Sequence, residues 1–277
     1  MKVVLFCGGQ GMRLQEYSGA VPKPLVPIGD RPILWHIMKY YAHYGHTEFI
    51  LCLGHKAHAI KEYFLSYNEA LSNDFVLSRG GNEVRLLDTD IHDWKITFVN
   101  TGLDACVGER LMAVRDFVSE DGYFLANYAD GLSDIDVNDM IRYATERNSV
   151  ACFAGVEPNA SFHVIESDDG GSVTRISNVA RSGIRINGGF FVLHQTVFDY
   201  MEPGDELVEE PFERLIREGR LSTYKHSGFW ACMDTFKEKQ QLEDLFQNGE
   251  PPWMVWEQKK RAATASALEA IATRSGD

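Results

Sequence analysis

Long hydrophobic runs, paired cysteines and an excess of positive charge are all missing from this chain of 277 residues. No segment approaches the length of a transmembrane helix, and the N-terminal apolar run is too short for a signal peptide. The chain carries 27 Lys and Arg against 40 Asp and Glu, a net charge of −13. Since nucleic acids and membrane surfaces attract cationic proteins, we expect a protein that binds neither.

The five cysteines, at positions 7, 52, 106, 152 and 232, are odd in number and scattered, without C-x-x-C spacing. That distribution predicts reduced thiols in a cytoplasmic protein and no cysteine-rich zinc site. A G-x-S-x-G nucleophile elbow is also missing. With 44% hydrophobic residues, the chain can form one large α/β domain or two small ones.

The most informative stretch is the N-terminus. The short apolar run 2–6 predicts a buried first strand, and a glycine-rich turn follows it, containing Gly8, Gly9 and Gly11. Glycines let backbone N–H groups approach a polyanion, although a plain tight turn is the simpler interpretation. Arg13 adds a forked donor for phosphate oxygens, and Lys23, between two prolines, adds a mobile point charge. Together they predict a triphosphate site.

Two common nucleotide motifs are absent from this turn. Leu14 stands where a G-x-G-x-x-G dinucleotide motif needs glycine or alanine, and no Gly-Lys-Ser/Thr follows as in a P-loop. A nicotinamide-dependent oxidoreductase is therefore disfavoured.

The order of predicted elements indicates an α/β fold with a Rossmann-like, mostly parallel mixed sheet and helices on both faces. Strands are expected at 2–6, 49–53, 95–99, 122–126, 151–156, 162–166, 173–176, 186–193 and 221–225. Helices are expected at 33–41, 57–67, 108–117, 137–145, 195–201, 210–218 and 234–247. Residues 1–257 form a single domain in this interpretation, with a nucleotide-binding half at 1–150 and a smaller, mixed half at 151–257. The Ala/Ser/Thr-rich tail 258–277 predicts a loose helix or disorder.

Two aspartates are candidate ligands of Mg²⁺, which prefers carboxylate and phosphate oxygens. Asp130 follows a predicted buried strand, and an Asp-Gly turn or helix cap is its alternative role. Asp234 precedes a predicted helix, so it is either an N-cap or a metal ligand if the fold brings it beside Asp130. Asp134 and Asp136 are better candidates for capping.

Several other positions are candidates either for ligand contact or for a structural role. Thr101-Gly102, at a strand end, could meet a base or ribose through the backbone. Arg110 is either a nucleotide contact or a solvated helix residue. Glycines in Asn187-Gly188-Gly189 indicate close approach of a ligand or a β-bulge. His36, His43 and His46 lack metal-ligand partners and are expected to be structural, and Trp253 and Trp256 to pack on the body or on a neighbouring subunit.

These residues resemble the sugar-1-phosphate nucleotidyltransferases, and most closely the glucose-1-phosphate cytidylyltransferase branch. The resemblance spans the chain to about residue 257. The motifs that carry it are Gly8–Leu14, Pro22–Pro24, Ile33–Met38, Ile60–Phe64, Thr101-Gly102, Gly108–Leu111, Tyr128–Gly131, Ile186–Leu193, Glu210-Pro211, Gly228–Trp230, Met233–Thr235 and Pro252-Trp253.

The resemblance implies a Mg²⁺-dependent enzyme that forms a CDP-sugar and pyrophosphate from CTP and a hexose 1-phosphate, and a homo-oligomer. It implies that the glycine loop, with Met12, cradles the nucleotide, that Arg13 contacts the β- and γ-phosphates, and that Lys23 lies near the α-phosphate. Asp130 and Asp234 hold the metal. It also assigns Thr101, Gly102 and Arg110 to the nucleotide, and Tyr128, His163, Asn187, Gly188 and Glu210 to the acceptor.

The chain departs from the family pattern on the acceptor side. The family's Glu-Lys-Pro before Asn-Gly-Gly is replaced by 176–182, Ile-Ser-Asn-Val-Ala-Arg-Ser, so the lysine for the acceptor phosphate is missing. Arg181 or Arg185 is the candidate substitute, and His163 replaces a glycine of the family. A different phosphate or phosphonate acceptor is thus the first alternative, and a non-enzymatic nucleotide-binding regulator the second.

Overall fold

The structure is a computed structural model that describes residues 1–9, 21–159, 162–249 and 251–257. A seven-stranded sheet lies at its centre in the order β14-β10-β13-β8-β1-β4-β7. Its strands are β1 (Lys2–Phe6), β4 (Glu48–Leu53), β7 (Lys95–Asn100), β8 (Tyr123–Asn127), β10 (Ala151–Val156), β13 (Ile186–His194) and β14 (Leu221–Lys225). Neighbouring strands are parallel except where β13 takes part. The expected α/β fold is confirmed.

The strand order reverses next to β1. The chain builds outward from β1 to β4 and β7, and then returns to the other side of β1 with β8. In open α/β sheets, ligands bind beyond the carboxyl ends of the strands at such a reversal. The segments after β1 and β8 begin with Cys7 and Tyr128, so Gly8, Gly9 and Asp130 lie at this edge.

The two faces of the sheet are both buried, which explains the nearly continuous apolar strands. On β1, Val3 and Leu5 join one core cluster, and Val4 and Phe6 join the other. The helices that contribute to the first cluster are α2 (Ile33–His43), α3 (Ala57–Leu65), α6 (Val137–Glu146) and α8 (Phe236–Gln247). Those of the second are α4 (Val107–Ala113), α5 (Arg115–Val118) and α7 (Glu210–Arg217). Among the described helices, none combines the length and apolarity needed to cross a bilayer.

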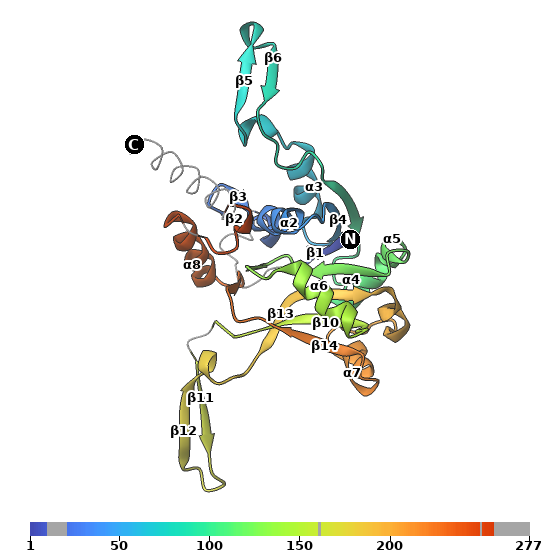
Figure 1. Ribbon diagram of the computed structural model, residues 1–277, viewed down its shortest axis with the longest axis vertical. Coiled ribbons are helices and arrows are strands. Elements are labelled where there is room, and N and C mark those ends of the chain that lie inside the picture. The colour runs from blue at the N-terminus through green and yellow to red at the C-terminus, as the bar shows by residue number, and fades with distance from the viewer. Residues whose placement is uncertain (10–20, 160–161, 250, 258–277) are drawn as a thin grey trace, which may run out of the picture.

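Four two-stranded sheets accompany the central one. They pair β2 (Pro27–Ile28) with β3 (Arg31–Pro32), β5 (Phe75–Ser78) with β6 (Glu83–Leu86), β9 (Gly131–Ser133) with β15 (Trp230–Cys232), and β11 (His163–Ser167) with β12 (Val173–Asn178). Figure 1 shows the β5–β6 and β11–β12 hairpins projecting from opposite ends of the molecule. Sequence patterns predicted β11–β12 but missed the others, whose strands have only two to four residues.

Several helix boundaries differ from the expected ones. The helix expected at 108–117 is divided at Val114, whose φ of −109° and ψ of 8° leave the helical region. Residues 195–200 form a 3-10 helix instead of an α-helix. Asp136 caps α6 as expected, whereas the Asp134 side chain bonds to His226. Helix α8 begins at Phe236 with Thr235 as its N-cap, so the capping role considered for Asp234 is wrong.

The buried histidines are structural, as expected. His36 Nε2 lies 3.0 Å from the Ile28 carbonyl oxygen, and the Trp253 indole N–H donates to its Nδ1 at 3.4 Å. Burial lowers the pKa of His36 to about 4, so the ring is neutral at pH 7. The His46 Nδ1 lies 3.3 Å from the Met1 amino group. Trp253 and Trp256 are buried in the body of the same chain.

Candidate active site

Lys23 joins the two candidate metal ligands. It begins a 3-10 turn, Lys23–Leu25, after Pro22, whose extended backbone (φ −67°, ψ 151°) precedes the turn. The Lys23 side chain is 13% exposed, and its Nζ lies 2.7 Å from Asp130 Oδ2 and 2.5 Å from Asp234 Oδ1. The fold therefore does bring Asp234 beside Asp130, around a single ammonium group.

Two local features place these carboxylates. After β8 the chain turns at Ala129, which has φ of +60°, and the Asn127 side chain accepts a hydrogen bond from the Ala129 N–H at 2.9 Å. Strand β9 then pairs with β15, and the Met233 N–H donates to the Asp130 carbonyl at 2.9 Å. Because this pairing fixes residue 233 against residue 130, Asp234 reaches the same edge from more than a hundred residues away in sequence.

The electrostatics of the triad follow from partial burial. Burial alone would lower the pKa of Lys23, but the Asp130 and Asp234 carboxylates outweigh it and raise that pKa. Burial also raises the pKa of Asp130, against the opposing effect of the Lys23 ammonium. Lys23 is thus firmly protonated at neutral pH. It supplies a fixed positive charge and no general base.

The buried Arg110 side chain connects the loops that follow β1 and β7. Its guanidinium donates to the Gly8 carbonyl at 3.2 Å and to the Gly102 carbonyl at 2.9 Å, and to the Thr101 hydroxyl at 2.8 Å. Arg110 is 4% exposed, so its interpretation as a solvated helix residue is wrong. A Cβ at Gly8 would lie 2.0 Å from the guanidinium, which gives this glycine a packing reason. The ends of β1 and β7 are held together here.

The Asn187–Gly189 segment forms a bulge. The pairing of β10 with β13 jumps from Phe153–Phe191 to Gly155–Asn187, so the bulge considered for these glycines is confirmed. Gly189 has φ of +76°, and a Cβ there would lie 2.6 Å from the Tyr128 ring. The Asn187 side-chain amide donates to the Tyr128 hydroxyl at 3.2 Å, and the Trp230 indole N–H donates to the Gly188 carbonyl at 2.8 Å. Tyr128, Asn187 and Gly188 are therefore brought together.

The other predicted acceptor residues do not join this group by any described hydrogen bond. Arg185 donates to the Gly155 and His226 carbonyls at 2.8 and 2.6 Å. His163 is exposed on the β11–β12 hairpin, opposite Asn178. Glu210 is exposed at the start of α7 and accepts from the Glu206 N–H at 3.0 Å. Gly11, Met12, Arg13 and the Arg181 side chain lie outside the described parts of the structure, and Gly9 is exposed at the end of the described loop.

The carboxylate pair fits Mg²⁺. The described residues contain no group of three or more His, Cys, Asp or Glu side chains that could hold a metal. Mg²⁺ is, however, commonly held by one or two carboxylates, with substrate phosphates and waters supplying the remaining oxygens. Asp130 and Asp234 already share one cation, so a divalent cation with a bound polyphosphate meets a suitable donor set.

Sequence reasoning missed two side chains at this edge. Trp230 packs its indole over the bulge, and Glu238 accepts hydrogen bonds from the Asp234 and Thr235 N–H groups. The sequence held a signal for Glu238, because Thr235-x-x-Glu238 is a capping box. The role of Trp230 depends on pairing between β9 and β15, which no local pattern indicates.

A sheet edge of this form is typical of enzymes that bind phosphorylated nucleotides at the ends of parallel strands. Residues 2–237 match the nucleotidyl transferase family, and the chain belongs to that family.

Individual relatives agree with this assignment. A Bacillus subtilis protein named "Probable glucose-1-phosphate cytidylyltransferase" is 40% identical over 92% of this chain and 100% of its own length. Glucose-1-phosphate cytidylyltransferase of Salmonella typhi is 37% identical over 93% of this chain and 100% of its own length. The crystal structure of HddC from Yersinia pseudotuberculosis complexed with GMP-PN has a TM-score of 0.62 at 20% identity, over 88% of this chain and 99% of HddC. This likeness supports the fold.

Proposed function

We propose that the protein transfers CMP from CTP to a sugar 1-phosphate, with glucose 1-phosphate as the default acceptor, and releases pyrophosphate. The observation that carries the proposal is the contact of Lys23 with both Asp130 and Asp234 at the edge where β1 and β8 end. The names of relatives at 37–40% identity support the choice of CTP and of the sugar phosphate.

The reaction needs two anions to meet in line. An oxygen of the acceptor phosphate attacks the α-phosphorus of CTP, and the bond from that phosphorus to the oxygen bridging to the β-phosphate breaks. The acceptor oxygen is already anionic at neutral pH, so no strong base is required. Catalysis is then mainly positioning and charge neutralisation, for which the Lys23 ammonium is available. Contact of Arg13 with the leaving phosphates remains a prediction from sequence.

Mg²⁺ is part of the proposal. Asp130 and Asp234 would hold it, with Lys23 moving from between them toward the phosphates. A bound divalent cation would supply charge stabilisation to the polyphosphate. The residues of this chain do the rest: Lys23 neutralises the α-phosphate, and the Gly8 backbone, fixed by Arg110, lines the nucleotide side.

The contacts of Arg185 bear on the identity of the acceptor. Arg185, one candidate for the missing family lysine, is engaged by the Gly155 and His226 carbonyls. That observation favours, as a second candidate, CMP transfer to a different phosphate or phosphonate.

A pyrophosphate-release assay that crosses the four nucleoside triphosphates with sugar 1-phosphates and other phosphorylated acceptors tests the proposal. We expect turnover with CTP and glucose 1-phosphate that EDTA abolishes and added Mg²⁺ restores. Turnover with another nucleotide but none with CTP would overturn the cytidylyl assignment. Binding of CTP without turnover on any acceptor would favour a regulatory nucleotide-binding protein.

We also propose a homo-oligomer in the cytoplasm. Within the described residues, β5 and β6 pair only with each other, and Phe75, Leu77 and Val84 are exposed apolar residues on one face of that hairpin. An isolated two-stranded hairpin is marginal in water, so a second copy of this chain is the partner we propose for that face. Light scattering should give a multiple of the 31.3 kDa chain mass, and Leu77→Glu should reduce it. The five free cysteines support a reducing compartment.

A further inference from the structure

Glu238 makes several hydrogen bonds to the segment that carries Asp234. Its Oε2 accepts hydrogen bonds from the Asp234 N–H at 2.9 Å, the Thr235 N–H at 2.8 Å and the Thr235 hydroxyl at 3.0 Å. In return, the Glu238 N–H donates to Thr235 Oγ1 at 3.3 Å. An ordinary capping box satisfies the N-cap residue alone, whereas this one also binds the residue before it.

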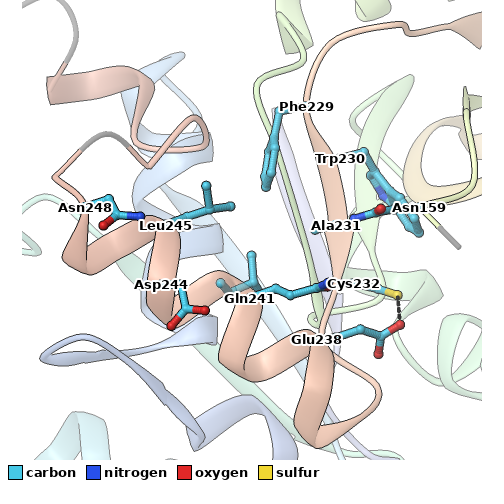
Figure 2. A pocket seen from close by; sticks show the side chains of 11 residues that line it. Asn159, Phe229, Trp230, Ala231, Cys232, Glu238, Gln241, Asp244, Leu245 and Asn248 are labelled. Atoms are coloured by element: carbon cyan, nitrogen blue, oxygen red, sulfur yellow. Dashed lines mark hydrogen bonds between the residues drawn. The ribbon is translucent and has the colours of Figure 1, made fainter. Parts of the chain in front are cut away.

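The second carboxylate oxygen is held from another direction. The Cys232 thiol donates to Glu238 Oε1 at 3.9 Å. Figure 2 shows the Glu238 carboxylate turned toward the Cys232 sulfur, beside a cavity of about 360 Å³ between β15 and α8.

These contacts span the point where strand β15 becomes helix α8. Pairing with β9 fixes the chain as far as Met233, and helix α8 fixes it from Phe236. Asp234 and Thr235 lie between the two, and Glu238 is the side chain that binds both of their N–H groups. The direction in which the Asp234 carboxylate leaves the backbone therefore depends on Glu238.

We infer that Glu238 is a positioning residue for the metal, one that holds the backbone of Asp234 so that its carboxylate faces the site it shares with Asp130. The inference rests on the proposed function, because it presumes that Asp130 and Asp234 hold the cation. Residues that orient metal ligands through hydrogen bonds typically contribute 10–100-fold to metal affinity, so roughly this effect is expected here.

The test measures the metal directly. Mn²⁺ binding in the presence of a non-hydrolysable CTP analogue is titrated by electron paramagnetic resonance for the wild type, Glu238→Met and Glu238→Gln. Methionine keeps the length and helix propensity of the side chain but accepts no strong hydrogen bond, and we expect its Mn²⁺ dissociation constant to rise roughly 10–100-fold. Glutamine completes capping boxes, so Glu238→Gln should stay within about threefold of the wild type.

Asp136→Ala is the matched control. It removes the N-cap of α6, where Asp136 accepts from the Asn138 and Asp139 N–H groups at 3.0 and 3.1 Å. It should lower thermal stability about as much as Glu238→Met and leave Mn²⁺ binding unchanged. If Asp136→Ala weakens Mn²⁺ equally, or if Glu238→Met binds it like the wild type, Glu238 has only a capping role.

The proposed function fails in a different way. A wild type that binds no Mn²⁺ with the nucleotide analogue would remove the metal site itself, and with it this inference. A wild type that binds Mn²⁺ while all three variants match it would leave the proposed function intact and remove only the role of Glu238. Should Glu238→Met not fold, Thr235→Val is the substitute variant, because it removes the hydroxyl contact of Glu238 Oε2 and should weaken Mn²⁺ to a smaller degree.

Discussion

The carboxyl ends of β1, β4 and β7, the proposed nucleotide edge, and the start of β13, the proposed acceptor edge, are built by different means. The ends of β1, β4 and β7 are tied to the buried Arg110, which donates to the Gly8, Leu53 and Gly102 carbonyls. At β13 the chain is a bulge packed under Tyr128 and Trp230, and it continues from an exposed hairpin. The nucleotide side is therefore pre-organised from within the protein, whereas the acceptor side depends on surface segments.

The largest effect is expected at Lys23, which contacts both Asp130 and Asp234. In the proposed mechanism, Lys23→Ala removes the charge that neutralises the transferred phosphate, and Asp130→Asn removes the charge of a proposed metal ligand. Each should lower turnover about 10³-fold in the pyrophosphate assay with little change in the circular dichroism spectrum. Lys2→Ala, which breaks the surface pair with Asp121, is the control and should keep normal turnover. Near-normal rates in Lys23→Ala would refute its role.

Arg110→Met tests whether the nucleotide edge is held by this buried side chain. Several carbonyls would lose their donor, so we expect about 3 kcal/mol less stability in urea unfolding. The KM for CTP should rise about tenfold while the KM for the acceptor changes little. Arg142→Met, at an exposed pair with Asp139, should change neither. An equal rise in the KM for CTP and in the KM for the acceptor would contradict the separation of the two edges.

Acid should lower the stability of the whole fold, because His36 on helix α2 is buried and contacts the Ile28 carbonyl and Trp253. Its pKa in the folded state, about 4, lies below the ordinary value of 6.5. Below the ordinary value the unfolded chain binds a proton that the folded chain does not, so stability falls as the pH decreases. We expect a loss of about 2 kcal/mol between about pH 7 and pH 5 in urea titrations.

His36→Gln should flatten that pH dependence. Amide exchange measured at the lower pH should increase equally near Gly8 and near Gly188. Faster amide exchange near only one of these two glycines would show that His36 does not stabilise both regions.

The smallest effect is expected at His163. Its side chain is exposed on the hairpin, so His163→Ala should change the KM for the acceptor by no more than about twofold. Steady-state kinetics with varied acceptor measures this. A tenfold change would show that the hairpin folds over the acceptor, and would place His163 where the family resemblance put it.

The sequence predicted most of the central sheet because its strands are buried on both faces and carry strong local patterns. Residue chemistry and the rule that ligands meet at strand ends pointed to Lys23 and Asp130, whereas Asp234 was grouped with them only by the family resemblance. The sequence could not predict that Arg110 is buried, since a helix pattern gives no information about which loops fold over a side chain. The contacts of Arg185 could not be predicted for a similar reason: its guanidinium donates to the Gly155 and His226 carbonyls, which lie far from it in sequence.

The reversed direction of β13 has an evolutionary consequence. Strands β8 and β10, the neighbours of β13, end at the active edge and place there the loops that follow them. Strand β13 runs the opposite way, so it places there its own first residues. The chain that leads into it, 157–185, can therefore gain or lose residues without disturbing any loop on the nucleotide side. With the substrate sides proposed above, changes in residues 157–185 can alter the acceptor during evolution while the residues at the nucleotide side stay the same.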